Sequence, residues 1–161
     1  MIEEIIIKMI DYFNGDIRRI NHALKVHSFA TMIAKRENVS TDMLRIIEIA
    51  AILHDIGIKE AERKYNSTAG SYQEIEGPPI AENLIKQFCL NFDEVERIKF
   101  IIGNHHSYSK IDGLDLQILV EGDFIVNIYE DNLDKEVIKK IKEKYFKTKS
   151  GSDILDLMYI R

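Results

Sequence analysis

Apolar residues recur at intervals of three and four along almost the entire chain, and this periodicity constrains the fold more than any other feature. Such spacing lines one face of an α-helix, and no segment alternates with the period of two that a half-buried strand shows. The two prolines are adjacent, Pro78 and Pro79, so few positions interrupt a helix. The pattern predicts an all-α bundle of about seven to eight helices with no sheet. The expected helices cover residues 2–13, 16–38, 40–57, 78–88, 91–106, 114–129, 136–145 and 153–159.

The length of 161 residues suits one domain. We expect a single domain over residues 1–161, with its core in about 15–130 and closing helices in 131–161. The helix over 40–57 is apolar almost all round, which predicts a central position. Residues 59–70 are polar and predicted to be irregular, with at most a short helix, and to form part of a pocket rim.

Composition narrows the classes of partner. The net charge is −5 and no basic run exceeds two residues, so nucleic acid is not expected as the main partner. No apolar stretch approaches the roughly 20 residues of a membrane helix, and the first residues do not resemble a signal peptide. The single cysteine, Cys89, fits a reducing compartment. We therefore expect a cytoplasmic protein without a membrane partner. The sequence leaves open whether the protein forms a homodimer.

Polar residues inside apolar runs carry the functional information, because their burial without partners costs several kcal/mol. His54 and Asp55 end the most apolar helix, His22 lies on the core stripe of its helix, and Asp123 follows the buried face of another. His and Asp together suit borderline metals. Each residue alone also has a plain structural interpretation, as a packed histidine or a capping aspartate.

The adjacent pair His105 and His106 ends another apolar run, and His105 continues its core stripe. Two histidines on a turn are also common surface residues. The His-Glu-x-x-His motif is absent, and no histidine has a glutamate three residues before it, which excludes zincin and ferritin-like patterns. No glycine-rich phosphate loop occurs.

Taken in order, His22, the segment Leu53-His54-Asp55-Ile56-Gly57 and Asp123 resemble the signature of the HD-domain metal-dependent phosphohydrolases. The resemblance covers about residues 15–130 and implies that His22, His54, Asp55 and Asp123 bind a divalent metal on an all-helical core. Gly122 stands where many members have alanine. Many members hold a second metal with further histidines, and in one subgroup the first of these precedes a Gly-Pro segment. In this chain Glu76 stands at that position before Gly77-Pro78, and His105 matches the next histidine.

The resemblance implies one or two divalent ions, with iron or manganese favoured and cobalt, nickel, zinc and magnesium as alternatives. Asp55 is the natural bridge between two metals and could orient the attacking water. Arg19, one turn before His22, and Lys59 are candidates for binding the substrate phosphate, and His106 for proton donation. We expect a small phosphorylated substrate, with a nucleotide favoured. The alternative is a metal- or nucleotide-sensing domain without turnover, and the complete ligand set argues against it.

Overall fold

The computed structural model describes residues 1–161 and is helical throughout, without a strand. The predicted all-α fold is confirmed. The structure also has a short 3-10 turn, η1 (Tyr108–Lys110), and a final π-helical turn, η2 (Asp156–Ile160). None of the helices is long and apolar enough to cross a membrane. The α-helices are α1 (Ile2–Phe13), α2 (Ile17–Arg36), α3 (Thr41–Leu53), α4 (Ile58–Tyr65), α5 (Gly70–Ile85), α6 (Phe92–Ile102), α7 (Leu114–Glu130), α8 (Lys135–Tyr145) and α9 (Lys149–Leu155).

Side-chain caps fix where several helices begin. Asp16 accepts a hydrogen bond from the Arg19 backbone N–H at 3.2 Å, and Ser40 does the same for Met43. Asn91 and Glu94 form a reciprocal capping box at the start of α6. These caps satisfy N–H groups that the first turn of a helix leaves without partners.

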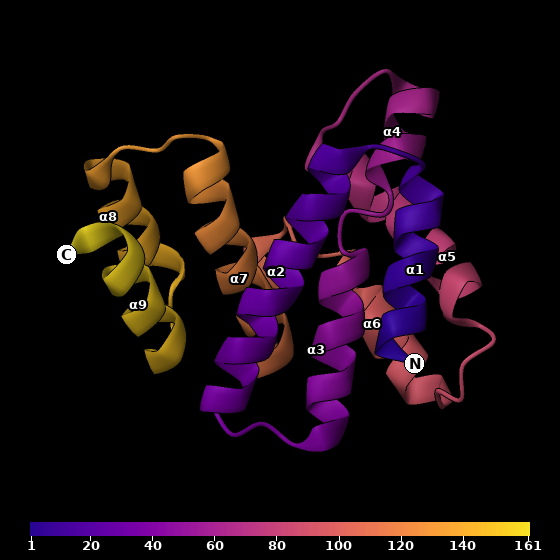
Figure 1. Cartoon of the computed structure of the whole chain (residues 1–161), viewed down its shortest axis with the longest axis horizontal. Helices are drawn as coiled ribbons and strands as arrows, with labels where there is room; N and C mark the ends of the chain where they lie inside the picture. Colours follow the sequence, from indigo (N-terminus) through magenta and orange to yellow (C-terminus); the bar gives the residue numbers. More distant parts are fainter.

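The helices α2, α3 and α7 form the centre of the molecule, with α2 packed against both others (Figure 1). In the same view, α8 and α9 lie at one end and α4 and α5 at the other. Two buried apolar clusters result, one among α2, α3, α7 and the closing helices, the other among α1, α3, α5 and α6. Ala50 and Ala51 of α3 belong to the first cluster, and Ile49 and Ile52 to the second, as expected of a central helix.

The structure refines the prediction in one segment and differs from it in another. Residues 58–65 form the short helix α4, which the prediction allowed within 59–70, and irregular structure is confined to the residues that follow it. Helix α5 begins at Gly70 and not near Pro78, and it contains both prolines. Its first half is held by close packing: a Cβ added at Gly57 would lie 2.5 Å from the Gln73 carbonyl oxygen and 2.6 Å from the Gly77 nitrogen. This contact with the turn after α3 supports the helix before the prolines.

Candidate metal centre

Four side chains from three parts of the fold meet at one point. His22 projects from the second turn of α2, His54 and Asp55 follow the end of α3, and Asp123 projects from α7. The His22 Nε2 atom lies 3.2 Å from His54 Nε2 and 3.2 Å from Asp123 Oδ1. Asp55 Oδ2 lies 3.5 Å from both Nε2 atoms. His22, His54 and Asp123 are buried, His54 completely.

When both rings are neutral, the position of the proton on each ring leaves the centre of this cluster without a proton donor. His54 Nδ1 is 2.8 Å from the Ala51 carbonyl oxygen, which only accepts, so Nδ1 carries the proton. His22 Nδ1 lies 2.9 Å from Glu130 Oε2 and is held in the same way. Both Nε2 atoms then direct lone pairs toward two carboxylates. A cation resolves this arrangement, and a backbone or carboxylate partner on the far nitrogen is the usual support of a metal-binding histidine. The donor set fits a divalent metal.

The charges of the cluster agree with this interpretation. Burial would raise the pKa of Asp55, but His54, His105 and His22 hold it far below the ordinary value. Burial lowers the pKa of His54, which favours the neutral form that binds metal. At His22 the effect of burial is outweighed by Asp123, Asp55 and Glu130, which raise its pKa to about 9. Without a metal, His22 therefore takes up a proton, and the protonated ring supplies the positive charge of the cluster.

A second group adjoins the first through Asp55. Asp55 Oδ1 lies 3.3 Å from His105 Nε2, while Oδ2 faces His22 and His54. His105 Nδ1 is 2.8 Å from the Ile102 carbonyl oxygen, and its buried Nε2 has no hydrogen-bond partner. The His106 ring lies against the His105 ring, with centroids 3.9 Å apart. Ligand atoms of Asp55, His105 and His106 all lie within 4.8 Å of one another. One carboxylate thus joins two groups of potential metal ligands.

Two hollows reach the cluster. A cavity of about 420 Å³ is lined by His22 and Asp55, together with Arg18, Arg19 and Thr68. A larger cleft of about 770 Å³ begins at His106. Thr68 follows α4, so part of the polar segment expected at the pocket rim does line the first cavity.

Residues 19–150 match the family model described as "HD domain". The chain belongs to the HD-domain family. None of the curated proteins matches it. A crystal structure of a predicted HD superfamily hydrolase from an uncultured Thermotogales bacterium has the same fold, with a TM-score of 0.69 and 23% sequence identity over 96% of this chain and 82% of that one. Membership of the HD-domain family supports a metal-dependent hydrolase in general.

Three other residues predicted for this HD-domain site have partners elsewhere. Glu76 is not brought to the cluster, because it bonds Lys64 Nζ at 2.8 Å and the Tyr65 hydroxyl at 2.9 Å. The Lys59 ammonium donates to the Tyr12 carbonyl oxygen at 2.9 Å and does not line the cavity. Arg19 does line it, but its guanidinium is held by both oxygens of Glu62.

Sequence reasoning missed residues that support the candidate metal ligands. Asn127 Nδ2 donates to Asp123 Oδ1 at 2.9 Å, and Glu130 holds both His22 and Lys25. Their signal was available, because positions 123, 127 and 130 share one face of α7. The role of Glu74 could not be predicted from spacing, because its carboxylate accepts a hydrogen bond at 3.0 Å from the backbone N–H of His106, which lies 32 positions away in the sequence.

Proposed function

We propose that this HD-domain protein is a metal-dependent phosphohydrolase that cleaves a phosphate ester or anhydride, with a nucleotide as its substrate, by metal-activated water. The observation that carries the proposal is Asp55, whose two oxygens face two different groups of buried ligands. When bound, a divalent metal lowers the pKa of its water toward neutrality and polarises a phosphoryl oxygen.

Each group of residues at the site has its own role in this proposal. His22, His54, Asp55 and Asp123 hold the first ion, and Glu130 and Asn127 keep His22 and Asp123 in place. Burial and the neighbouring His105 lower the pKa of His106 to about 4, which keeps its ring neutral and suited to binding a metal. Arg18 lines the cavity, is exposed and makes no ion pair, so its guanidinium is available for a phosphate oxygen. Arg19 lines the same cavity, and the Glu62 carboxylate holds its guanidinium in place.

We further propose two ions, the second held by Asp55, His105 and His106. These residues fit the second position better than Glu76, which is neutralised by Lys64. Iron or manganese suits the mixture of nitrogen and oxygen donors. The metal content should fall from two ions toward one in a His105→Ala, His106→Ala double variant and stay at two in Glu76→Ala. Wild-type protein that holds one ion at saturating metal would refute the second site.

The central experiment loads the purified protein with iron, manganese, cobalt or nickel and screens hydrolysis of a nucleotide panel. Asp55→Ala should lose both metal and activity while keeping its helical circular dichroism. Asp11→Ala removes an exposed carboxylate of α1 and is the matched control. Full metal occupancy in Asp55→Ala would refute the ligand assignment. Metal binding without hydrolysis of any phosphate compound would favour the sensing domain.

A further inference from the structure

The cleft that begins at His106 differs in charge from the rest of the molecule. Its volume is about 770 Å³, and its lining includes three lysines, Lys110, Lys144 and Lys147, but no aspartate or glutamate. The whole chain has 27 acidic and 22 basic residues. A cleft lined by one sign of charge attracts ligands of the opposite sign. Its composition therefore points to an anionic ligand.

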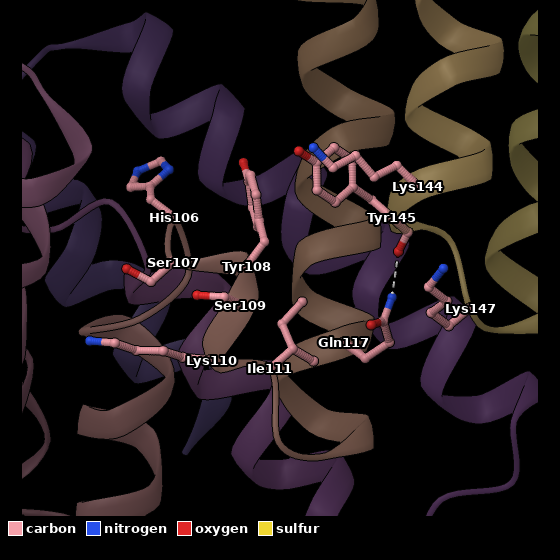
Figure 2. Close-up of a pocket in the computed structure, with 10 residues that line it drawn as sticks. All are labelled: His106, Ser107, Tyr108, Ser109, Lys110, Ile111, Gln117, Lys144, Tyr145 and Lys147. Atoms are coloured by element: carbon pink, nitrogen blue, oxygen red, sulfur yellow. Dashed lines mark hydrogen bonds between the residues drawn. The ribbon is translucent and has the colours of Figure 1, made fainter.

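None of the three lysines that line this cleft forms an ion pair. On neighbouring positions, Lys139 pairs with Glu136, Lys142 with Asp156 and Lys149 with Asp153. Lys144 instead extends over the ring of Tyr145, 5.1 Å from its centroid, and Lys147 is exposed. Figure 2 shows Lys110 extending away from Tyr145, whereas Lys144 lies beside it.

Aromatic rings form the wall between the metal ligands and these lysines. Tyr108 stands between His106 and Tyr145 in Figure 2. The Tyr108 and Tyr145 ring centroids are 4.7 Å apart, and Phe124 stacks behind Tyr145 at 4.9 Å. Partly exposed rings of this kind offer a flat apolar surface on which a nucleobase can stack, in the way aromatic side chains bind bases.

The far wall of the cleft is held by a buried carboxylate. Glu121 of α7 accepts hydrogen bonds from the backbone N–H groups of Lys147 and Thr148, at 2.7 and 2.9 Å. Gln117, one turn earlier, donates to the Tyr145 carbonyl oxygen at 2.7 Å. Asp123, two residues after Glu121, belongs to the metal cluster. One helix thus fixes the distance between the metal ligands and the lysine-bearing wall.

We propose that this cleft binds the part of the substrate that lies beyond the scissile phosphate, and that Lys144 and Lys147 select nucleotides with a further phosphate group. The inference rests on the proposed function, since it places the scissile phosphate at the metal ligands next to His106. The base or sugar packs against Tyr108 and Tyr145, and the remote phosphate meets the two ammonium groups. A nucleoside monophosphate leaves the lysines without a partner.

The test compares a Lys144→Ala, Lys147→Ala double variant with a Lys135→Ala, Lys140→Ala variant. The control removes the same charge from exposed, unpaired positions of α8. Isothermal titration in EDTA measures binding of ATP and adenosine 3′,5′-bisphosphate without turnover. Loss of two exposed charge contacts should weaken binding about tenfold, or about 1.4 kcal/mol, with the control unchanged. Metal-loaded enzyme should lose a similar factor in kcat/KM for these nucleotides, mainly through KM, and none for p-nitrophenyl phosphate.

The outcomes separate the two proposals. Binding that depends on Lys144 and Lys147 without any phosphatase activity would remove the proposed function but keep the cleft as a nucleotide site. Hydrolysis of phosphate esters with equal nucleotide affinity in wild type and the Lys144, Lys147 variant would overturn the cleft assignment. Equal weakening by the Lys135, Lys140 control would also overturn it, because the effect would then come from net charge alone.

Discussion

Replacement of Glu121 by alanine should damage this protein more than any other single change at a charged residue outside the metal centre. The Glu121 side chain is completely buried and accepts four hydrogen bonds. Its donors are Gln117 Nε2, the backbone N–H groups of Lys147 and Thr148, and the Thr148 hydroxyl. Alanine would leave all four donors in the core without this partner.

The magnitude follows from the number and kind of donors. A buried donor that loses its partner costs about 1–3 kcal/mol, but water entry keeps four such costs from adding fully. Removing one partner of a buried charged network typically costs about 3–5 kcal/mol, and we expect that range for Glu121→Ala. In a domain of this size, each kcal/mol lowers the melting temperature by about 2–4 °C. The expected fall is therefore on the order of 10 °C.

Glu121→Gln provides the discriminating comparison. A glutamine carbonyl oxygen can take the place of Oε1, which accepts from Gln117 and both backbone groups. The glutamine amide can donate to the Thr148 hydroxyl oxygen, so this variant should lose less than half of what alanine loses. Urea denaturation followed by circular dichroism measures both, with the exposed Glu143→Ala as control. A loss below about 1 kcal/mol in Glu121→Ala would refute the reasoning.

Three further predictions concern packing, pH and metal. Gly122→Val should cost about 1–3 kcal/mol by overpacking α2 against α7, since a Cβ at Gly122 lies 3.2 Å from the Ala30 nitrogen, and thermal denaturation will show it. The Asn91 backbone N–H and Arg45 lower the pKa of Glu94 below 4.5, so its contribution to stability is full above pH 4.5 and is lost as pH falls through the lowered value. Urea titrations below pH 4.5 should therefore show wild type losing stability faster than Glu94→Gln. Removing metal with EDTA should lower the melting temperature by on the order of 10 °C where the ion was present at about 1,000 times its Kd, and an unchanged value would argue against a bound ion.

Sequence patterns predicted the central helix and its caps because these depend on local spacing. The apolar surface of α3 on all sides required burial on all sides, and the structure places it between both clusters. The expected helices 16–38, 40–57 and 91–106 begin at Asp16, Ser40 and Asn91, and the structure places these residues as N-caps, since an N-cap acts within three residues of itself. Core-facing stripes placed His22 and Asp123 inside the bundle and His54 and Asp55 at the end of the central helix, and the family resemblance implied that the four side chains converge.

Sequence patterns failed where distant packing decides the outcome. Pro78 and Pro79 suggested the first turn of a helix, yet α5 extends eight residues earlier because Gly57 and Gly77 let it press against the turn after α3. The position of Glu76 depended on the same contact. Once α4 is helical, Lys64 and Tyr65 project toward Glu76 and bond its carboxylate, and no local pattern of residues 58–65 announced that pairing.

The arrangement of α7 explains how an acidic chain can be suited to an anionic substrate. One face of this helix supplies Asp123 with Asn127 and Glu130, which concentrate negative charge where a metal would neutralise it. Two residues before Asp123, the Glu121 carboxylate accepts buried hydrogen bonds and therefore adds no negative charge to the surface of the cleft. That carboxylate instead fixes the backbone that carries Lys147. Placing the acidic residues of α7 in the metal cluster and the core leaves the cleft surface to lysines and aromatic rings. The same division predicts that a substitution on α7 will change either the metal content, measured by elemental analysis, or the nucleotide affinity, measured in EDTA, according to the face that it alters.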